Sequence, residues 1–177
     1  MSTTKWSLDP THSEVSFKIK HMMISNVTGN LKSFNVTAET NGDDFTQAKV
    51  SFNADVNSIN TNNEQRDGHL KSGDFFDSEK YPQIKFEATK MNKVSDDEYS
   101  VDGNLTIRDV TKPVKLKADF GGIAKDPYGN TKAGFTVEGK INRKDFGLTW
   151  NAATEAGGVL VGEDLKLHAE IQLVKQI

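Results

Sequence analysis

The strongest constraint on the fold is an alternation of apolar and polar side chains with a period of two, which recurs along most of the chain. Between residues 14 and 21, Val15, Phe17 and Ile19 share one parity, and polar or charged residues occupy most of the positions between them. A period of two places successive side chains on opposite faces of a β-strand. The pattern predicts eight strands, at residues 14–21, 31–38, 49–56, 84–89, 99–107, 114–120, 135–141 and 165–173. The parity changes between Leu31 and Phe34, as a β-bulge would require.

Short connections rich in turn-forming residues separate the predicted strands, and they favour antiparallel neighbours. These connections lie at residues 41–44, 95–98, 126–130 and 156–158. One segment has the pattern of a helix: Thr61 and Glu64 have the spacing of a capping box, residues 62–71 follow, and Ser72-Gly73 supplies a stop. A lone helix cannot interleave with a parallel sheet, so the sequence predicts an all-β fold.

The length of 177 residues suits one domain, spanning residues 1–177. About eight antiparallel strands with one charged face cannot stay an open flat sheet, because the apolar face would meet water and the edges would stay unpaired. The strands must therefore close into a barrel or fold into a sandwich. An eight-stranded barrel has an interior that side chains can just fill, or that can hold one slender ligand.

The predicted inner face is almost entirely apolar. Gly103 and Gly139 share its parity and leave room beside the aromatic rings, so an apolar channel is one interpretation. The other is that glycine marks bends while alanine packs against phenylalanine in a dry core, and the pattern alone favours this second interpretation. The inward aromatic residues are Phe17, Phe34, Phe52, Phe86, Phe120 and Phe135.

Composition disfavours several classes of function. The formal charge of −3 gives no basic surface large enough for nucleic acid, and the absence of cysteine removes disulfides, thiolate nucleophiles and cysteine metal sites. The four histidines lack metal-ligand spacing, so we expect no metal and no cofactor. No apolar run resembles a signal sequence or a membrane span. The chain as given is therefore expected in the cytoplasm, unless a leader sequence has been removed.

The sequence contains no recognisable catalytic motif. No phosphate-binding glycine loop, nucleophile elbow or zinc-binding helix motif is present, and the neighbours His12 and Ser13 would diverge on a strand. Three polar residues could instead lie at the mouth of a cavity: His21 at the end of an apolar face, Arg66 on the predicted helix and Arg143 at a strand end. A hydrogen-bonded rim histidine and a structural ion pair are the simpler alternatives.

Several dispersed blocks resemble the YceI-like, polyisoprenoid-binding proteins. The resemblance extends from about Trp6 to Val174. It rests on residues 6–13 (WSLDPTHS) with Val15, Phe17 and His21 after them, and on blocks at 58–61, 66–70, 74–77, 81–86, 103–108 and 142–148.

The resemblance implies an eight-stranded, antiparallel, lipocalin-like barrel with one short helix and a long apolar tunnel for an isoprenoid or similar amphiphile. Members of this family are often periplasmic and often dimeric, so a homodimer is a possible assembly. The resemblance thus favours a hollow interior over a solid one.

Our first hypothesis is a non-catalytic protein that binds, stores or transports a long-chain amphiphilic lipid. The expected head-group or mouth residues are His21, Arg66 and Arg143. The expected tunnel lining is Val15, Phe17, Ile19, Phe34, Val36, Phe52, Ala54, Phe86, Leu105, Phe135 and Val137. One alternative is an enzyme acting on a lipidic substrate, with His21 or His12 as acid or base. The other is a stress-linked interaction protein with a solid barrel.

Overall fold

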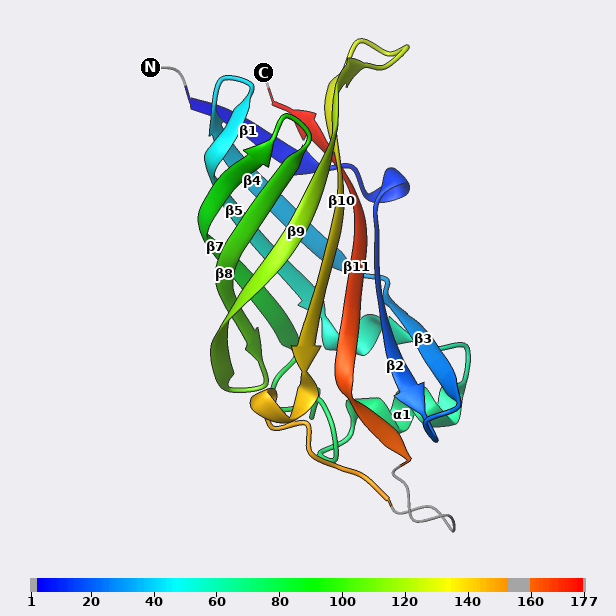
Figure 1. Ribbon diagram of the computed structural model, residues 1–177. Helices are drawn as coiled ribbons and strands as arrows, with labels where there is room; N and C mark the ends of the chain where they lie inside the picture. The colour runs from blue at the N-terminus through cyan, green and yellow to red at the C-terminus, as the bar shows by residue number, and fades with distance from the viewer. Residues whose placement is uncertain (1–2, 153–159, 177) are drawn as a thin grey trace.

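A computed structural model describes residues 3–152 and 160–176, which are mostly strands (Figure 1). Eight strands close into an antiparallel barrel, because β11 pairs with β10 on one side and with β1 on the other. In their order around the barrel these strands are β1 (Thr3–Leu8), β4 (Phe34–Asn41), β5 (Asp44–Asp55), β7 (Gln83–Ser95), β8 (Glu98–Ile107), β9 (Val110–Lys125), β10 (Thr131–Asn142) and β11 (Val161–Lys175). The prediction of an all-β barrel with one helix is confirmed.

Three further strands extend the sheet beside the barrel. β2 (Glu14–His21) follows β1 along the same edge of β11, and a 3-10 turn at Pro10–His12 separates the two. β3 (Ser25–Leu31) pairs with β2, and the short β6 (Ile59–Asn60) pairs with β3. Two other 3-10 turns lie at Val56–Ser58 and Arg143–Phe146. In Figure 1, β2 and β3 lie at the lower end, next to the helix, whereas both termini lie at the opposite end.

The parity change between Leu31 and Phe34 has a different cause from the predicted one. It is not a bulge within one strand, because β3 ends at Leu31 and β4 begins at Phe34. β1 was not predicted at all. The predicted turns at 41–44, 95–98 and 126–130 join β4 to β5, β7 to β8 and β9 to β10, and the one at 156–158 lies outside the described residues.

The helix α1 (Glu64–Lys71) begins two residues later than predicted. Its N-cap is Asn63, whose Oδ1 accepts from the backbone N–H of Arg66 at 3.0 Å. The predicted capping box is wrong, because the Thr61 hydroxyl donates to the buried carboxylate of Asp67 at 2.5 Å. The predicted stop is confirmed, since Ser72 is the C-cap and its N–H donates to His69 O. Because α1 packs at one end of the barrel, the hydrogen bonds at its two ends fix the position of the side chains that border the interior there.

Inward glycines accommodate the rings of neighbouring residues. A Cβ on Gly29 would collide with the ring of Phe17, which is its partner across the β2–β3 ladder. A Cβ on Gly103 would collide with the ring of Phe86 and would lie 2.6 Å from the carbonyl oxygen of Glu87. The space beside these glycines is therefore filled by side chains, as in a packed core. The open space lies elsewhere, along the barrel axis.

Candidate ligand-binding cavities

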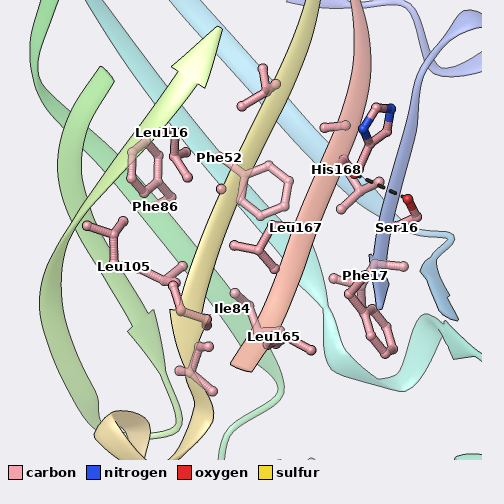
Figure 2. Close-up of a pocket in the computed structure, with 18 of the residues that line it drawn as sticks. Ser16, Phe17, Phe52, Ile84, Phe86, Leu105, Leu116, Leu165, Leu167 and His168 are labelled. Carbon is pink, nitrogen blue, oxygen red and sulfur yellow. Dashed lines mark hydrogen bonds between the residues drawn. The ribbon is translucent and has the colours of Figure 1, made fainter. Parts of the chain in front are cut away.

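A central cavity of about 200 Å³ lies inside the barrel. Every strand of the ring except β1 contributes inward side chains to its lining, and β2 contributes Val15 and Phe17. Figure 2 shows Phe52, Phe86, Leu105 and Leu167 among these side chains. The alternation of each strand explains the apolar wall, because the charged residues of the same strands point outward. The barrel is thus hollow at its centre.

Two polar residues border the central cavity without offering it a polar group. Ser16 Oγ donates to the backbone O of His168 at 3.4 Å, between β2 and β11. The ring of His168 lies 2.9 Å from Glu170 and 3.5 Å from Glu138, and both carboxylates are exposed. The imidazole is therefore on the outer surface (Figure 2). A ligand in this cavity would meet hydrocarbon alone.

An aromatic cluster closes the barrel at the end that carries the termini. It consists of Trp6, Phe45, Tyr99, Phe120 and Phe135, with Phe45 at its centre. The ring centroid of Phe45 lies 5.1 Å from that of Trp6, 5.8 Å from Phe120 and 5.0 Å from Phe135. Trp6 Nε1 donates to Thr40 Oγ1 at 2.8 Å, which satisfies its one polar group. The interior is thus closed at this end rather than being a through tunnel.

A second cavity of about 160 Å³, the end cavity, lies at the α1 end. Along β10 the order is Phe135 in the aromatic cluster and then Val137 to Ile141 at the central cavity, and Arg143, in the 3-10 turn directly after β10, lies at the end cavity. Phe17, Phe76 and Leu165 line both cavities and so form the wall between them. The two spaces are therefore consecutive chambers on one axis.

Arg143 lies against the end cavity and is 2% exposed. Its guanidinium donates to four backbone carbonyls: Nε to Gly162 O at 2.7 Å, Nη1 to Leu148 O at 2.5 Å and Trp150 O at 2.9 Å, and Nη2 to Val161 O at 3.2 Å. Burial lowers the pKa of Arg143, and the neighbouring Glu163 partly offsets this. The side chain ties the segment after β10 to the start of β11, and its charge faces neutral acceptors.

Arg66 positions the start of α1 and also lines the end cavity. Its Nε donates to Thr61 Oγ1 at 2.8 Å and its Nη2 donates to Thr61 O at 2.7 Å. Thr61 donates in turn to Asp67 from both its backbone N–H, at 2.9 Å, and its hydroxyl. This network fixes α1 to the segment that follows β6. Arg66 is half-buried, and its hydrogen bonds to Thr61 use Nε and Nη2.

His69, Phe75 and Trp150 form an aromatic group at the same end. The His69 ring meets that of Trp150 edge-on at 4.6 Å and that of Phe75 at 5.1 Å, and its Nε2 lies 2.9 Å from Asp74 Oδ2. His69 is 38% exposed at its side chain, so the end cavity lies close to the surface here. His21, at the end of β2, lines the same cavity.

The structure brings together most of the residues expected at the site. Val15, Phe17, Val36, Phe52, Phe86, Leu105 and Val137 line the central cavity, and Ile19 lines the end cavity with all three expected mouth residues. Three expected tunnel residues lie elsewhere. Phe135 belongs to the aromatic cluster, Ala54 is buried in the core, and Phe34 packs against Phe52 at 6.2 Å between ring centroids.

Sequence reasoning missed several residues that shape the interior. Phe45 lies off the predicted parity of its strand, and Phe75, Phe76 and Trp150 lie in irregular segments where no period exists. The sequence did contain one signal for these residues, which is the presence of several aromatic residues in segments without strand periodicity. Such residues are expected to pack across the end of a barrel.

No group of metal-ligating side chains was found in the part of the chain that the structure describes. His12 does have a carboxylate partner, since its Nδ1 lies 2.8 Å from Asp9 Oδ2, but it is exposed and lines neither cavity. Within residues 3–152 and 160–176, no carboxylate hydrogen bonds to His21, and no helix is long and apolar enough to span a bilayer.

Comparison with known proteins gives concordant matches over almost the entire chain. Residues 6–173 match the model of the YceI-like domain. A UPF0312 protein from Staphylococcus aureus strain N315 is 39% identical over 170 residues, which cover 96% of each chain.

Solved structures extend the comparison. The crystal structure of a Campylobacter jejuni YCEI protein is 35% identical, with a TM-score of 0.77 over 96% of this chain and 97% of the other. A polyisoprenoid binding domain from Saccharophagus degradans, implicated in plant cell wall breakdown, is 16% identical with a TM-score of 0.72, over 97% and 98% of the chains. At that identity the likeness concerns the fold alone.

Proposed function

This chain belongs to the YceI-like family, and from that premise we propose that it binds a long-chain lipid, of the polyisoprenoid class or a related amphiphile, inside its barrel. The observation that carries the proposal is the central cavity, whose lining offers hydrocarbon and no polar side-chain group. A polar ligand would lose its hydration there without gaining hydrogen bonds, whereas an apolar chain gains free energy by leaving water.

The dimensions of the interior favour a slender ligand. Each cavity alone is smaller than the 300–1,000 Å³ of typical small-molecule sites, but the two consecutive chambers together reach the lower end of that range. A flexible chain that displaces Phe17 or Phe76 from the wall between them would occupy both. The aromatic cluster sets the far limit, so the chain enters from the α1 end and its tail lies towards Phe135.

The end cavity is the proposed place for the polar head of the ligand. His21 and Arg66 line it and retain ring or guanidinium nitrogens that can reach a ligand. Arg143 contributes a buried positive charge whose acceptors are all neutral carbonyls, which favours an anionic or strongly polar head group. The proposed orientation is therefore head at α1 and tail at the centre.

We propose that the binding is non-catalytic. General acid or base catalysis by a histidine requires that the imidazole lies beside the reacting atoms and that a hydrogen-bonding partner orients it. His21 has no carboxylate partner among the described residues, and the pair Asp9–His12 lies outside both cavities. A storage or carrier role uses the apolar interior alone.

The test is native mass spectrometry of gently purified protein, followed by solvent extraction and identification of the released molecules. We expect a bound long-chain lipid, and its recovery unchanged after long incubation. Phe52→Trp fills part of the central cavity and should reduce the bound fraction at least several-fold. Asn53→Trp is the matched control, because residue 53 is exposed on the outer face of the same strand. Absence of bound lipid, together with no uptake of added polyprenyl chains, would refute the proposal.

A further inference from the structure

The turn between β2 and β3 presents three consecutive apolar side chains to solvent. Met22, Met23 and Ile24 are 44%, 60% and 80% exposed, and we call them the hairpin tip. Figure 1 shows this turn at the lower end of the barrel, beside α1. A run of large apolar residues at the end of a hairpin, rather than one scattered exposed residue, marks a surface that contacts something apolar.

The backbone of the hairpin tip is unfavourable for the residues it carries. Met22 and Met23 have φ angles of 53° and 62°, and the N–H of Ile24 donates to His21 O at 3.2 Å. Positive φ at both central residues of a β-turn favours Asn and Gly, and a long side chain such as that of methionine is disfavoured there. The turn keeps two methionines where smaller residues would be more stable, and such strain is typical of functional positions.

A row of lysines lies on the outer face of the sheet behind the hairpin tip. Lys18 on β2 is paired across the strands with Lys166 on β11, which is paired with Lys140 on β10. Like charges directly opposite each other destabilise a sheet. Lys140 lies 3.6 Å from Asp164, whereas Lys18, Lys166 and the nearby Lys20 have no carboxylate partner among the described residues. Lys18, Lys140 and Lys166 line an open groove of about 750 Å³, which Lys117 and Glu138 also border.

The spacing along β2 places the lysines within reach of a surface that the hairpin tip enters. At about 3.3 Å per residue, Lys20 lies about 7 Å and Lys18 about 13 Å behind Met22 along β2. An apolar group that enters a membrane interface penetrates about 5–10 Å, and lysine side chains reach phosphate groups from just above that depth. His21, next to Met22, lines the end cavity. Contact at this end would place the cavity at the lipid surface.

We propose that the α1 end of the barrel docks on a bilayer rich in anionic phospholipid. The hairpin tip inserts between the head groups, and Lys18, Lys20 and Lys166 lie against the lipid phosphates. The docking requires no ligand in the cavities, so it goes beyond the proposed function and stands or fails separately from it.

The test is co-sedimentation with vesicles of phosphatidylcholine alone, or of phosphatidylcholine mixed with phosphatidylglycerol, without any isoprenoid. We expect binding to the anionic vesicles and its loss at high salt. Replacing Met22→Asn, Met23→Gly and Ile24→Thr together should reduce the partition coefficient at least about tenfold and should raise the melting temperature, because Asn-Gly suits this turn. The double substitution Lys18→Gln and Lys166→Gln should reduce the partition coefficient by about fivefold for each lysine removed.

Tyr128→Ser is the matched control, since Tyr128 is 89% exposed at the turn between β9 and β10, near the opposite end. It should bind vesicles as the wild type does. The proposal is overturned if the wild type binds neither kind of vesicle, if the hairpin-tip variant binds as well as the wild type, or if salt has no effect. It is also overturned if the tip substitutions convert a dimer to a monomer while vesicle binding is absent, because the tip then joins two copies of the chain.

Discussion

Arg143 is a buried cation whose hydrogen bonds go to the backbone carbonyls of Leu148, Trp150, Val161 and Gly162. These carbonyls belong to two segments, one after β10 and one at the start of β11. Val161 O also accepts from Asn151 Nδ2 at 2.8 Å, whereas loss of the guanidinium would remove the side-chain donor of the Leu148, Trp150 and Gly162 carbonyls. The residue was predicted as a contact for a ligand head group, and the structure adds a role in holding the end cavity together.

Arg143→Met should therefore destabilise the protein by about 3–5 kcal/mol, because it removes one partner of a buried polar network. Arg143→Lys retains the charge but cannot reproduce the planar fork, so an intermediate loss is expected. Urea denaturation of both variants measures the difference. If Arg143→Met unfolded at the wild-type urea concentration, the hydrogen bonds would not be the main role of this side chain.

Asp9 connects the 3-10 turn between β1 and β2 to β10. The ammonium of Lys132, 2.5 Å away, holds the pKa of Asp9 well below its usual range; His12 and Thr11 act in the same direction, and burial opposes them. The pKa of Lys132 is raised, chiefly by Asp9. Asp126, 3.6 Å from Lys132, also has a lowered pKa, mainly because the backbone N–H of Asn130 donates to it.

The lowered pKa of Asp9 predicts a loss of stability in acid. In the unfolded chain the carboxyl of Asp9 has an ordinary pKa near 3.8. As the pH falls below this value, the unfolded state binds a proton at Asp9 while the folded state stays deprotonated there, so the free energy of unfolding decreases. The contribution is complete above that range and is lost as the pH falls towards the folded pKa. Asp9→Asn should be less stable at neutral pH and should show a flatter stability profile below pH 4. Melting temperatures measured between pH 2 and 7 test this prediction. It is contradicted if the variant and the wild type lose stability equally below pH 4.

At the scale of elements, strand parity was predictable and its interruptions were not. The alternation identified the inward residues of β8 and β10, which are regular over the residues that line the central cavity. In β5, Phe45 and Ala48 are both buried although their parities differ, because Gln47 has a φ of 63° and shifts the alternation. Such local conformations depend on tertiary packing, so Phe45 and the aromatic cluster could not be placed from the pattern.

The inward glycines offer a direct test of packing at this scale. Gly103→Ala should destabilise the barrel by about 1–3 kcal/mol, because its Cβ would collide with the ring of Phe86 and the carbonyl of Glu87. Gly134→Ala on β10 is the matched control: nothing lies within 4 Å of its Cβ, so no loss is expected. The measurement is the urea concentration at the midpoint of unfolding for each variant. Equal midpoints would mean that Phe86 moves aside without cost.

The aromatic cluster and the central cavity should respond differently to overpacking. Phe135→Trp enlarges a ring whose neighbours Phe45 and Phe120 lie 5.0 Å away, so we expect a loss of about 1–3 kcal/mol in the free energy of unfolding. Phe52→Trp can extend into the central cavity, so its loss should be smaller. Thermal denaturation of both proteins without ligand is the measurement. A larger loss for Phe52→Trp would mean that the cavity is not available to side chains.

At the scale of the whole molecule, the strand pattern predicted a barrel or a sandwich and the family resemblance selected the barrel, but neither predicted that one end is closed. Half-apolar strands require a closed or layered sheet, which limits the architecture. Whether the axis is filled depends on a few large side chains from irregular segments and strand ends, such as Phe45, Phe76 and Trp150. The result is a pair of chambers that end at the aromatic cluster.

The central claim is that this interior takes up a hydrocarbon chain from the α1 end as far as the aromatic cluster. Its most direct test is titration of delipidated protein with prenyl alcohols of increasing length, followed by the fluorescence of Trp150 at the end cavity; a Trp6→Phe background removes the other tryptophan. Affinity should rise by up to about fourfold for each additional buried methylene. It should then level off once the chain reaches the cluster. Affinity that does not depend on chain length, or no binding of any chain up to its solubility limit, would contradict the account.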